Sequence, residues 1–241
     1  MSSLNSVRLP DGSEVVISEW LHQPVISTIE FDSAATVDLR AYNYVRGQNV
    51  SSVGLTKRQA TDQDTNLVKK SAMNQDESLI VFAVTYEIFG LTAVTAQSSA
   101  PIANGPMLTA DNLRKLQLQA MFELYVGAGI KKPQLGVPFS WLSQSIGSPS
   151  WQSGDPGTVA ADAGTENRFY MNYGTGGVIS GSNQRVLKLP IYIGGYGRNA
   201  TPGNSMYFQG RFYNAYGGAF TDLNQDVRIR FVLDGLKKRP G

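Results

Sequence analysis

The sequence contains no cysteine and only one histidine. Without cysteine there can be no disulfide bond, thiolate metal site or cysteine nucleophile, so the fold must rest on packing. A metal site with two histidines is impossible, and no G-x-S-x-G motif provides a serine nucleophile to work with His22. We therefore expect no catalytic residue, no metal ion and no cofactor, and we expect His22 to have a surface or structural role.

Charged residues are also scarce, at 17% of the chain, whereas about 25% is typical of globular domains. The net charge of +2 is too small to indicate nucleic-acid binding by itself. No segment approaches the ~18 consecutive apolar residues of a membrane span, and the first residues lack the apolar run of a secretory signal. We expect synthesis and folding in a cytoplasm, and a polar surface covered in part by neighbouring subunits.

Strand patterns are present along most of the chain. Residues 79–89 (LIVFAVTYEIF) are apolar on both faces for most of their length, which predicts a strand at the centre of a sheet with material packed on both sides. The other predicted strands are 14–18, 24–31, 36–44, 186–193, 206–213 and 227–233.

The last predicted strand, VRIRFVL, lies very close to the end of the sequence. Its apolar residues alternate with polar ones, which predicts one buried and one solvated face. A single strand is not stable in water, so this one needs partners from much earlier in the chain. We expect it to lie beside residues 14–31.

One segment, LTADNLRKLQLQAMFELYVGAG, predicts a helix. Thr109 is a suitable N-cap, and Leu113 and Leu116 are at helical spacing. The apolar period then changes from helical spacing to alternation, so we predict a short helix over 110–119 followed by a strand that stops at Gly127. A continuous helix as far as Tyr125 is the alternative.

About nine strands and one short helix, without βαβ alternation, predict an all-β antiparallel sandwich or barrel. Most connections are too long for tight hairpins, which favours a Greek-key or jelly-roll path. We expect one domain over residues 1–241, built as a single jelly roll with long loops. A double jelly roll, with about sixteen strands, stays open if short strands are hidden in 47–76 and 130–182.

Segment 130–182 is predicted to be a long loop or insertion. It is rich in Gly, Ser, Pro and Asn, yet it contains three clusters of aromatic residues. Ordered loops of this length are usually functional or interfacial. Disorder is the rival interpretation, and the density of aromatic residues argues against it.

Two acidic features offer alternatives to a purely structural protein. Glu87 and Glu123 lie in predicted strands and could form the carboxylate pair of a glycosidase, although cross-strand polar contacts explain them more simply. The acidic stretch DQDTN at residues 62–66 is interpreted as a solvated loop rather than an ion site.

The order of four stretches carries a resemblance to a known family. DLRAYNYVRG is followed by DQDTNLVKKSAMNQDESLIVFAVTYEIFG, then by LTADNLRKLQLQAMFELYVGAGIKKPQLGVPFSWLSQSIG, and the sequence finishes with VRIRFVLDGLKKRPG. This layout resembles the jelly-roll major capsid proteins of icosahedral phages, in particular the vertical jelly-roll proteins of membrane-containing and related tailless phages. The resemblance covers most of the chain as an arrangement of segments and includes no catalytic motif.

The resemblance implies a shell subunit without an active site, located in the virion after synthesis in the host cytoplasm. Its partners would be copies of itself in trimeric or hexameric capsomers, together with minor capsid proteins, and no small-molecule substrate. Buried aromatic residues dominate interface energetics, so the candidate subunit contacts are Trp141, Trp151, Phe169, Tyr170 and Tyr173.

A basic group near the end of the chain could face the phosphates of an internal membrane or of the genome. Its members are Arg228, Arg230, Lys237, Lys238 and Arg239. The simpler interpretation is that these residues keep a strand end solvated. A receptor-binding or carbohydrate-binding sandwich module is the alternative to the capsid function.

Overall fold

We describe the fold from a computed structural model of the chain. The described residues are 6–8, 14–16, 20–74, 77–91, 110–127, 129, 131–144, 150–152, 170–172, 186–194, 206–221, 223 and 225–238. No helix within these ranges is both long enough and apolar enough to cross a membrane.

The larger of two main sheets has seven strands and follows the order β10-β7-β15-β4-β6, with β13 also paired to β7 and β3 to β15. Its strands are β3 (Trp20–His22), β4 (Val25–Phe31), β6 (Ser51–Val53), β7 (Ser78–Gly90), β10 (Ser143–Gln144), β13 (Val186–Gly194) and β15 (Val227–Lys238). The central position predicted for residues 79–89 is confirmed, because β7 lies between β15 on one side and β13 and β10 on the other.

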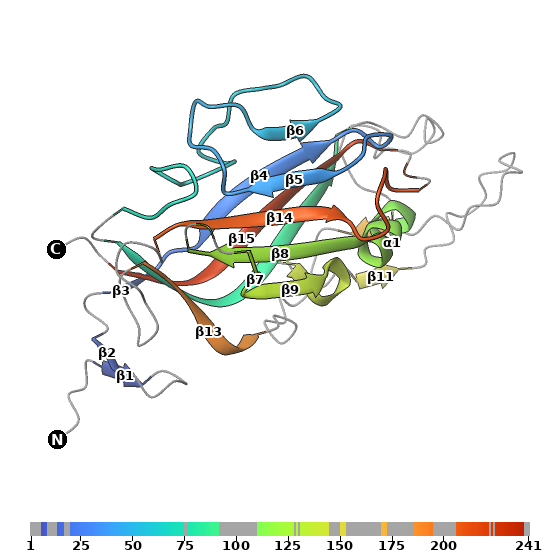
Figure 1. Ribbon diagram of the computed structural model, residues 1–241. Helices are drawn as coiled ribbons and strands as arrows, with labels where there is room; N and C mark the ends of the chain where they lie inside the picture. The colour runs from blue at the N-terminus through green and yellow to red at the C-terminus, as the bar shows by residue number, and fades with distance from the viewer. Residues whose placement is uncertain are drawn as a thin grey trace, which may run out of the picture.

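The smaller sheet has four strands in the order β5-β14-β8-β9 and lies in front of the larger one in Figure 1. Its strands are β5 (Asp38–Ala41), β8 (Ala120–Val126), β9 (Leu135–Pro138) and β14 (Phe208–Asn214). Two further pairs, β1 (Ser6–Arg8) with β2 (Glu14–Val16) and β11 (Ser150–Gln152) with β12 (Tyr170–Asn172), are separate.

The core lies between the two main sheets. Phe122 of β8 stacks on Phe231 of β15 with ring centroids 4.5 Å apart, and Phe31 of β4 lies 5.9 Å from Phe212 of β14. All four rings are buried, so apolar area and aromatic contacts join the inner faces of the two sheets. The predicted all-β sandwich is confirmed.

The eight longest strands in the described chain pair in a nested order. In chain order the first pairs with the last (β4 with β15), the second with the seventh (β5 with β14), the third with the sixth (β7 with β13) and the fourth with the fifth (β8 with β9). All four pairings are antiparallel. These eight strands therefore form one pair of packed sheets.

The strand at the end of the sequence lies where the sequence analysis expected, with one correction. β15 pairs antiparallel with β4 from Val227 opposite Phe31 to Leu233 opposite Val25, and its last residues pair with β3. Residues 14–16 instead pair with β1. β15 also continues five residues beyond its predicted end, through a bulge at Asp234 and Gly235.

The change from helix to strand is also confirmed. The helix α1 (Ala110–Gln119) is followed directly by β8, so the alternative of a continuous helix to Tyr125 is wrong. Leu113 and Leu116 are buried on the helix, and alternate residues of β8 are buried after it. Thr109, the expected N-cap, lies outside the described residues.

The long-loop prediction for 130–182 missed two strands that complete the main sheets. β9 pairs with β8, and β10 pairs with β7 next to the short 3-10 helix Phe139–Trp141. Sequence patterns did not reveal β9 (LGVP), because Gly136 and Pro138 are atypical of strand interiors. Its position at the edge of the smaller sheet explains why a proline is tolerated there.

Candidate functional site

Two polar networks lie on the outer faces of the sandwich, one on each sheet. Among the described residues no group of three or more His, Asp or Glu side chains could hold a metal ion. His22, in β3, is largely exposed, and its Nε2 lies 2.6 Å from Asp234 Oδ1. This side-chain hydrogen bond between β3 and β15 agrees with the structural role expected for His22.

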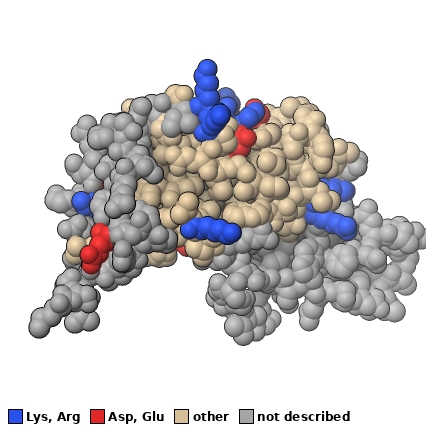
Figure 2. All heavy atoms as spheres, turned by 60° about the horizontal axis from the view of Figure 1, so that its bottom comes forward, with Lys and Arg blue, Asp and Glu red and all other residues tan. Residues whose placement is uncertain are grey.

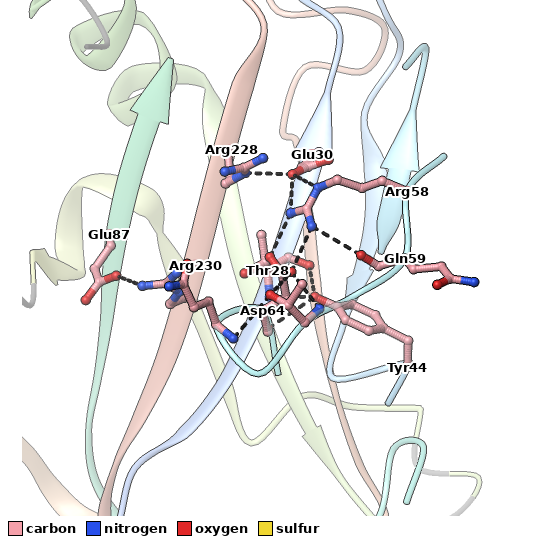
Figure 3. A network of polar contacts seen from close by, with 11 residues as sticks. Thr28, Glu30, Tyr44, Arg58, Gln59, Asp64, Glu87, Arg228 and Arg230 are labelled. Carbon is pink, nitrogen blue, oxygen red and sulfur yellow. Dashed lines mark hydrogen bonds and ion pairs between the residues drawn. The ribbon is translucent and has the colours of Figure 1, made fainter. Parts of the chain in front are cut away.

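The first network, here called the Arg58 clamp, consists of Arg58, Glu30, Asp64 and Arg228 (Figure 3). The Arg58 guanidinium donates from Nη2 to Glu30 Oε1 and to Asp64 Oδ1, both at 2.7 Å, and from Nη1 to Asp64 Oδ2 at 2.8 Å. Arg228 Nε donates to the same Glu30 oxygen at 2.6 Å. The clamp therefore fastens the segment between β6 and β7 to the outer face of β4 and β15.

Both carboxylates of the clamp are almost inaccessible to solvent. The side chains of Glu30 and Asp64 are 4% and 5% exposed. Burial by itself would raise the pKa of Asp64, but hydrogen bonds from Arg58 and from the backbone and hydroxyl of Thr61 outweigh it, so this pKa lies well below its usual value. The interpretation of residues 62–66 as a solvated loop is wrong for Asp64.

Tyr44 lies next to this network and binds the backbone of β4. Its hydroxyl donates to the Thr28 carbonyl at 2.5 Å and accepts from the Thr28 amide at 2.7 Å. Burial raises the pKa of Tyr44 to about 12, so the phenol is neutral at ordinary pH. The sequence showed no signal for the clamp, because residues 30, 58, 64 and 228 meet only through the tertiary fold.

The predicted basic group is placed mainly among acidic partners. Arg230 Nη1 lies 2.5 Å from Glu87 Oε2 on β7, directly across the strands, and Lys237 Nζ lies 3.0 Å from Glu77 Oε1. With Arg228 in the clamp, three of the group form ion pairs within the chain. Lys238 ends β15, and Arg239 lies outside the described residues. On the face shown in Figure 2, Lys and Arg atoms form separate small groups rather than one continuous basic area.

The second network lies on the outer face of the smaller sheet. We call the outward residues of β5, β14 and β8 the tyrosine face. They alternate with buried residues along each strand. The face consists of Asp38, Arg40, Gln209, Arg211, Tyr213, Met121, Glu123 and Tyr125.

Glu123 contacts three other side chains of the tyrosine face. The Tyr125 and Tyr213 hydroxyls donate to its two carboxylate oxygens at 2.6 and 2.9 Å, and Arg211 Nη1 lies 3.5 Å away. Arg211 also donates from Nε and Nη2 to the two Asp38 oxygens, both at 2.9 Å, and its guanidinium lies 4.3 Å from the Tyr213 ring centroid.

Contacts within the tyrosine face shift four pKa values. The hydrogen bond from Arg211 lowers the pKa of Asp38, and the same contact raises that of Arg211. The hydrogen bond to Glu123 raises the pKa of Tyr125, and burial together with the Glu123 contact raises that of Tyr213. The Asp38–Arg211 ion pair is therefore held in the charged form and the two phenols in the neutral form.

The proposed glycosidase pair is not brought together. Glu87 points outward from the larger sheet, between the buried Tyr86 and Ile88, and Glu123 points outward from the smaller one. Packed sheets lie about 10 Å apart. Two carboxylates on opposite outer faces are therefore separated by more than the roughly 5–9.5 Å between the two carboxyl groups of a glycosidase. Both residues instead have the cross-strand polar contacts that the simpler interpretation predicted.

The aromatic candidates for subunit contacts are only partly described. Trp141 is half-buried in the 3-10 helix and packs against the main core. Trp151 lies in β11 and Tyr170 in β12, which pair antiparallel with each other. Phe169 and Tyr173 lie outside the described residues. Of the five, Trp141 therefore contributes to the core of this chain.

The chain matches no protein-family model, no curated protein and no solved structure. Its function must therefore be argued from its own fold and surfaces.

Proposed function

We propose that this protein is the major capsid (coat) subunit of an icosahedral tailless bacteriophage and that it assembles with copies of itself into the shell. The nested pairing of the eight longest strands carries this proposal. A jelly roll arranges eight antiparallel strands in two packed sheets through Greek-key connections, and it is a common fold of viral capsid proteins. The pairing of β4 with β15, β5 with β14, β7 with β13 and β8 with β9 is the order expected of one such roll.

The roles of the acidic residues support a structural subunit. Fold alone does not imply function, so the side chains on the sheets must supply the rest of the argument. Glu30, Glu87 and Glu123 each hold an arginine of a neighbouring strand. These carboxylates act as fixed cross-strand links, which suits a rigid building block.

The proposal includes other copies in trimeric or hexameric capsomers and minor capsid proteins as partners, with the virion as location. The proposal also includes contact of the basic group with internal lipid or genome. Phosphates would have to compete with Glu30, Glu87 and Glu77, which already pair with Arg228, Arg230 and Lys237.

Carbohydrate binding is the second candidate function, because the tyrosine face combines half-buried phenol rings with fixed hydrogen-bonding groups. Jelly rolls also occur as lectin domains. A sugar chain could lie across Tyr125 and Tyr213 and share hydrogen bonds with Glu123 and Arg211.

The decisive experiment is the mass of the purified, untagged protein by light scattering on a sizing column, with negative-stain microscopy of the same peak. We expect trimers, hexamers or shell fragments that grow with protein concentration. A stable monomer without assembly across salt and pH would contradict the capsid proposal, and glycan binding would then be tested.

A further inference from the structure

We infer that the tyrosine face is a contact surface for the same face of a second copy of this chain. The inference rests on the proposed self-assembly and deepens it by naming the surface and its partner. The tyrosine face points outward, and in Figure 1 no described segment crosses in front of β5, β14, β8 and β9. The outer face of β4, in contrast, is covered by the segment that the Arg58 clamp holds.

Five of the eight residues of the tyrosine face are of types that are enriched at protein–protein contacts. Aromatic residues, Met and Arg are enriched at interfaces, whereas Lys, Glu, Asp, Ser and Ala are depleted. The residues of the enriched types on this face lie on three adjacent strands, and they are Tyr125, Tyr213, Met121, Arg40 and Arg211. Tyr and Arg are also the residue types that most often dominate binding energy.

Most charges of the face are already paired, so covering them requires little rearrangement. Arg211 holds both Asp38 and Glu123, and Glu123 also accepts from both tyrosines. A desolvated charge is costly chiefly when it has no partner. These side chains are also held in one arrangement before binding, which reduces the entropy lost on association.

Arg40 forms no close ion pair of its own within the described chain. Its charge helps to lower the pKa of Asp38, but that carboxylate is hydrogen-bonded to Arg211. Arg40 lies directly across the strands from Arg211, and like charges in that position repel each other. An acidic group from outside the chain would relieve this repulsion.

The same face of a second copy supplies that acidic group. Asp38 lies two residues from Arg40 on the same edge strand, and its side chain is 49% exposed. In a two-fold contact the same patch appears on both subunits, so Arg40 of each copy can approach Asp38 of the other. The face contains two arginines and two acids, and this balance favours a copy of itself over a strongly charged partner.

A charge-swap experiment tests this contact. Arg40→Asp gives the face a net negative charge and Asp38→Lys a net positive charge, so each variant repels itself. We expect each to associate at least about tenfold more weakly than wild type in sedimentation equilibrium. Mixed in equal amounts, the two variants should associate again, because their faces are then complementary.

Tyr216→Ala is the matched control, because Tyr216 is 82% exposed in the turn after β14 and outside the face. Tyr125→Ala should weaken association, whereas Tyr216→Ala should not. Thermal unfolding of each variant checks that it is folded.

The outcomes separate this inference from the proposed function. If wild type assembles and Arg40→Asp assembles equally well, or if the mixed variants fail to associate again, the tyrosine face is not the contact while self-assembly stands. If wild type never assembles, the proposed function fails. Binding of wild type on an array of bacterial glycans that Tyr125→Ala abolishes would overturn the inference in favour of a sugar site.

Discussion

Two buried tyrosines separated by one residue have opposite hydrogen-bonding situations. Tyr44 has its hydroxyl bonded to Thr28, whereas no hydrogen-bond partner for the fully buried Tyr42 hydroxyl is found in the described chain. A buried polar group without a partner costs roughly 1–3 kcal/mol. The same removal of an oxygen should therefore have opposite effects at the two positions.

We expect Tyr42→Phe to leave stability unchanged or to increase it by about 1 kcal/mol, because only a desolvated hydroxyl is lost. Tyr44→Phe should decrease stability by about 1 kcal/mol, because two hydrogen bonds to Thr28 disappear. Urea unfolding of both variants measures the difference. A clear loss of stability in Tyr42→Phe would show that its hydroxyl has a stabilising partner.

The Arg58 clamp gives a second prediction at the residue scale. Arg58→Met leaves Asp64 and Glu30 buried with less charge compensation, and removing one partner of a buried ion pair costs about 3–5 kcal/mol. We expect a loss near the lower end, about 3 kcal/mol, because Arg228 still pairs with Glu30. Arg46→Met is the control, because its ion pair with Asp62 is exposed and should contribute less than about 1 kcal/mol.

Asp64 also makes stability depend on pH. Its pKa is lowered in the folded state, while in the unfolded chain it is about 3.9. The unfolded state therefore binds the proton first, and the contribution of Asp64 to stability is lost as the pH falls below about 4. Urea unfolding between pH 6 and pH 3 should show this loss, and Asp64→Asn, although less stable, should show a smaller one.

At the scale of elements, β15 depends on a glycine at its bulge. A Cβ at Gly235 would overlap the carbonyl oxygen of Ile80 on β7, so the close approach of the two backbones requires glycine. This approach lets β15 continue to Lys238 and pair with β3.

We expect Gly235→Ala to destabilise the protein by about 3 kcal/mol or more, because backbone must move to admit the methyl group. Gly136→Ala in β9 is the control, because its nearest neighbour would be 3.5 Å from the new Cβ. That change should alter stability by less than about 1 kcal/mol. Equal thermal midpoints for both variants would contradict the role assigned to Gly235.

At the scale of the whole molecule, the larger sheet cannot form without β15, because this strand joins its two halves. β15 lies between β4 and β7 and supplies Ile229 and Phe231 to the core. A chain lacking residues 227–241 should therefore fail to fold, with loss of near-ultraviolet circular dichroism and rapid proteolysis. Removing only residues 239–241 should leave folding unchanged, and a folded product of the longer truncation would contradict this topology.

The sequence by itself determined the elements whose pattern is local. Alternation in residues 227–233 predicted a two-faced strand. Residues 79–89, apolar on both faces for most of their length, predicted a central strand, and the change of period after Gln119 predicted the helix-to-strand change. Such patterns depend on neighbouring residues, so they can be read before any partner is known.

Only the tertiary structure decided which residues meet. Asp64 was interpreted as part of a solvated loop, but the fold buries it against Arg58. Arg58 in turn holds Glu30, which is far away in sequence. The edge strand β9 likewise forms because β8 presents an open edge, not because LGVP favours a strand. Burial, ion pairing and edge pairing depend on contacts between separate segments of the chain, and local sequence patterns do not specify those contacts.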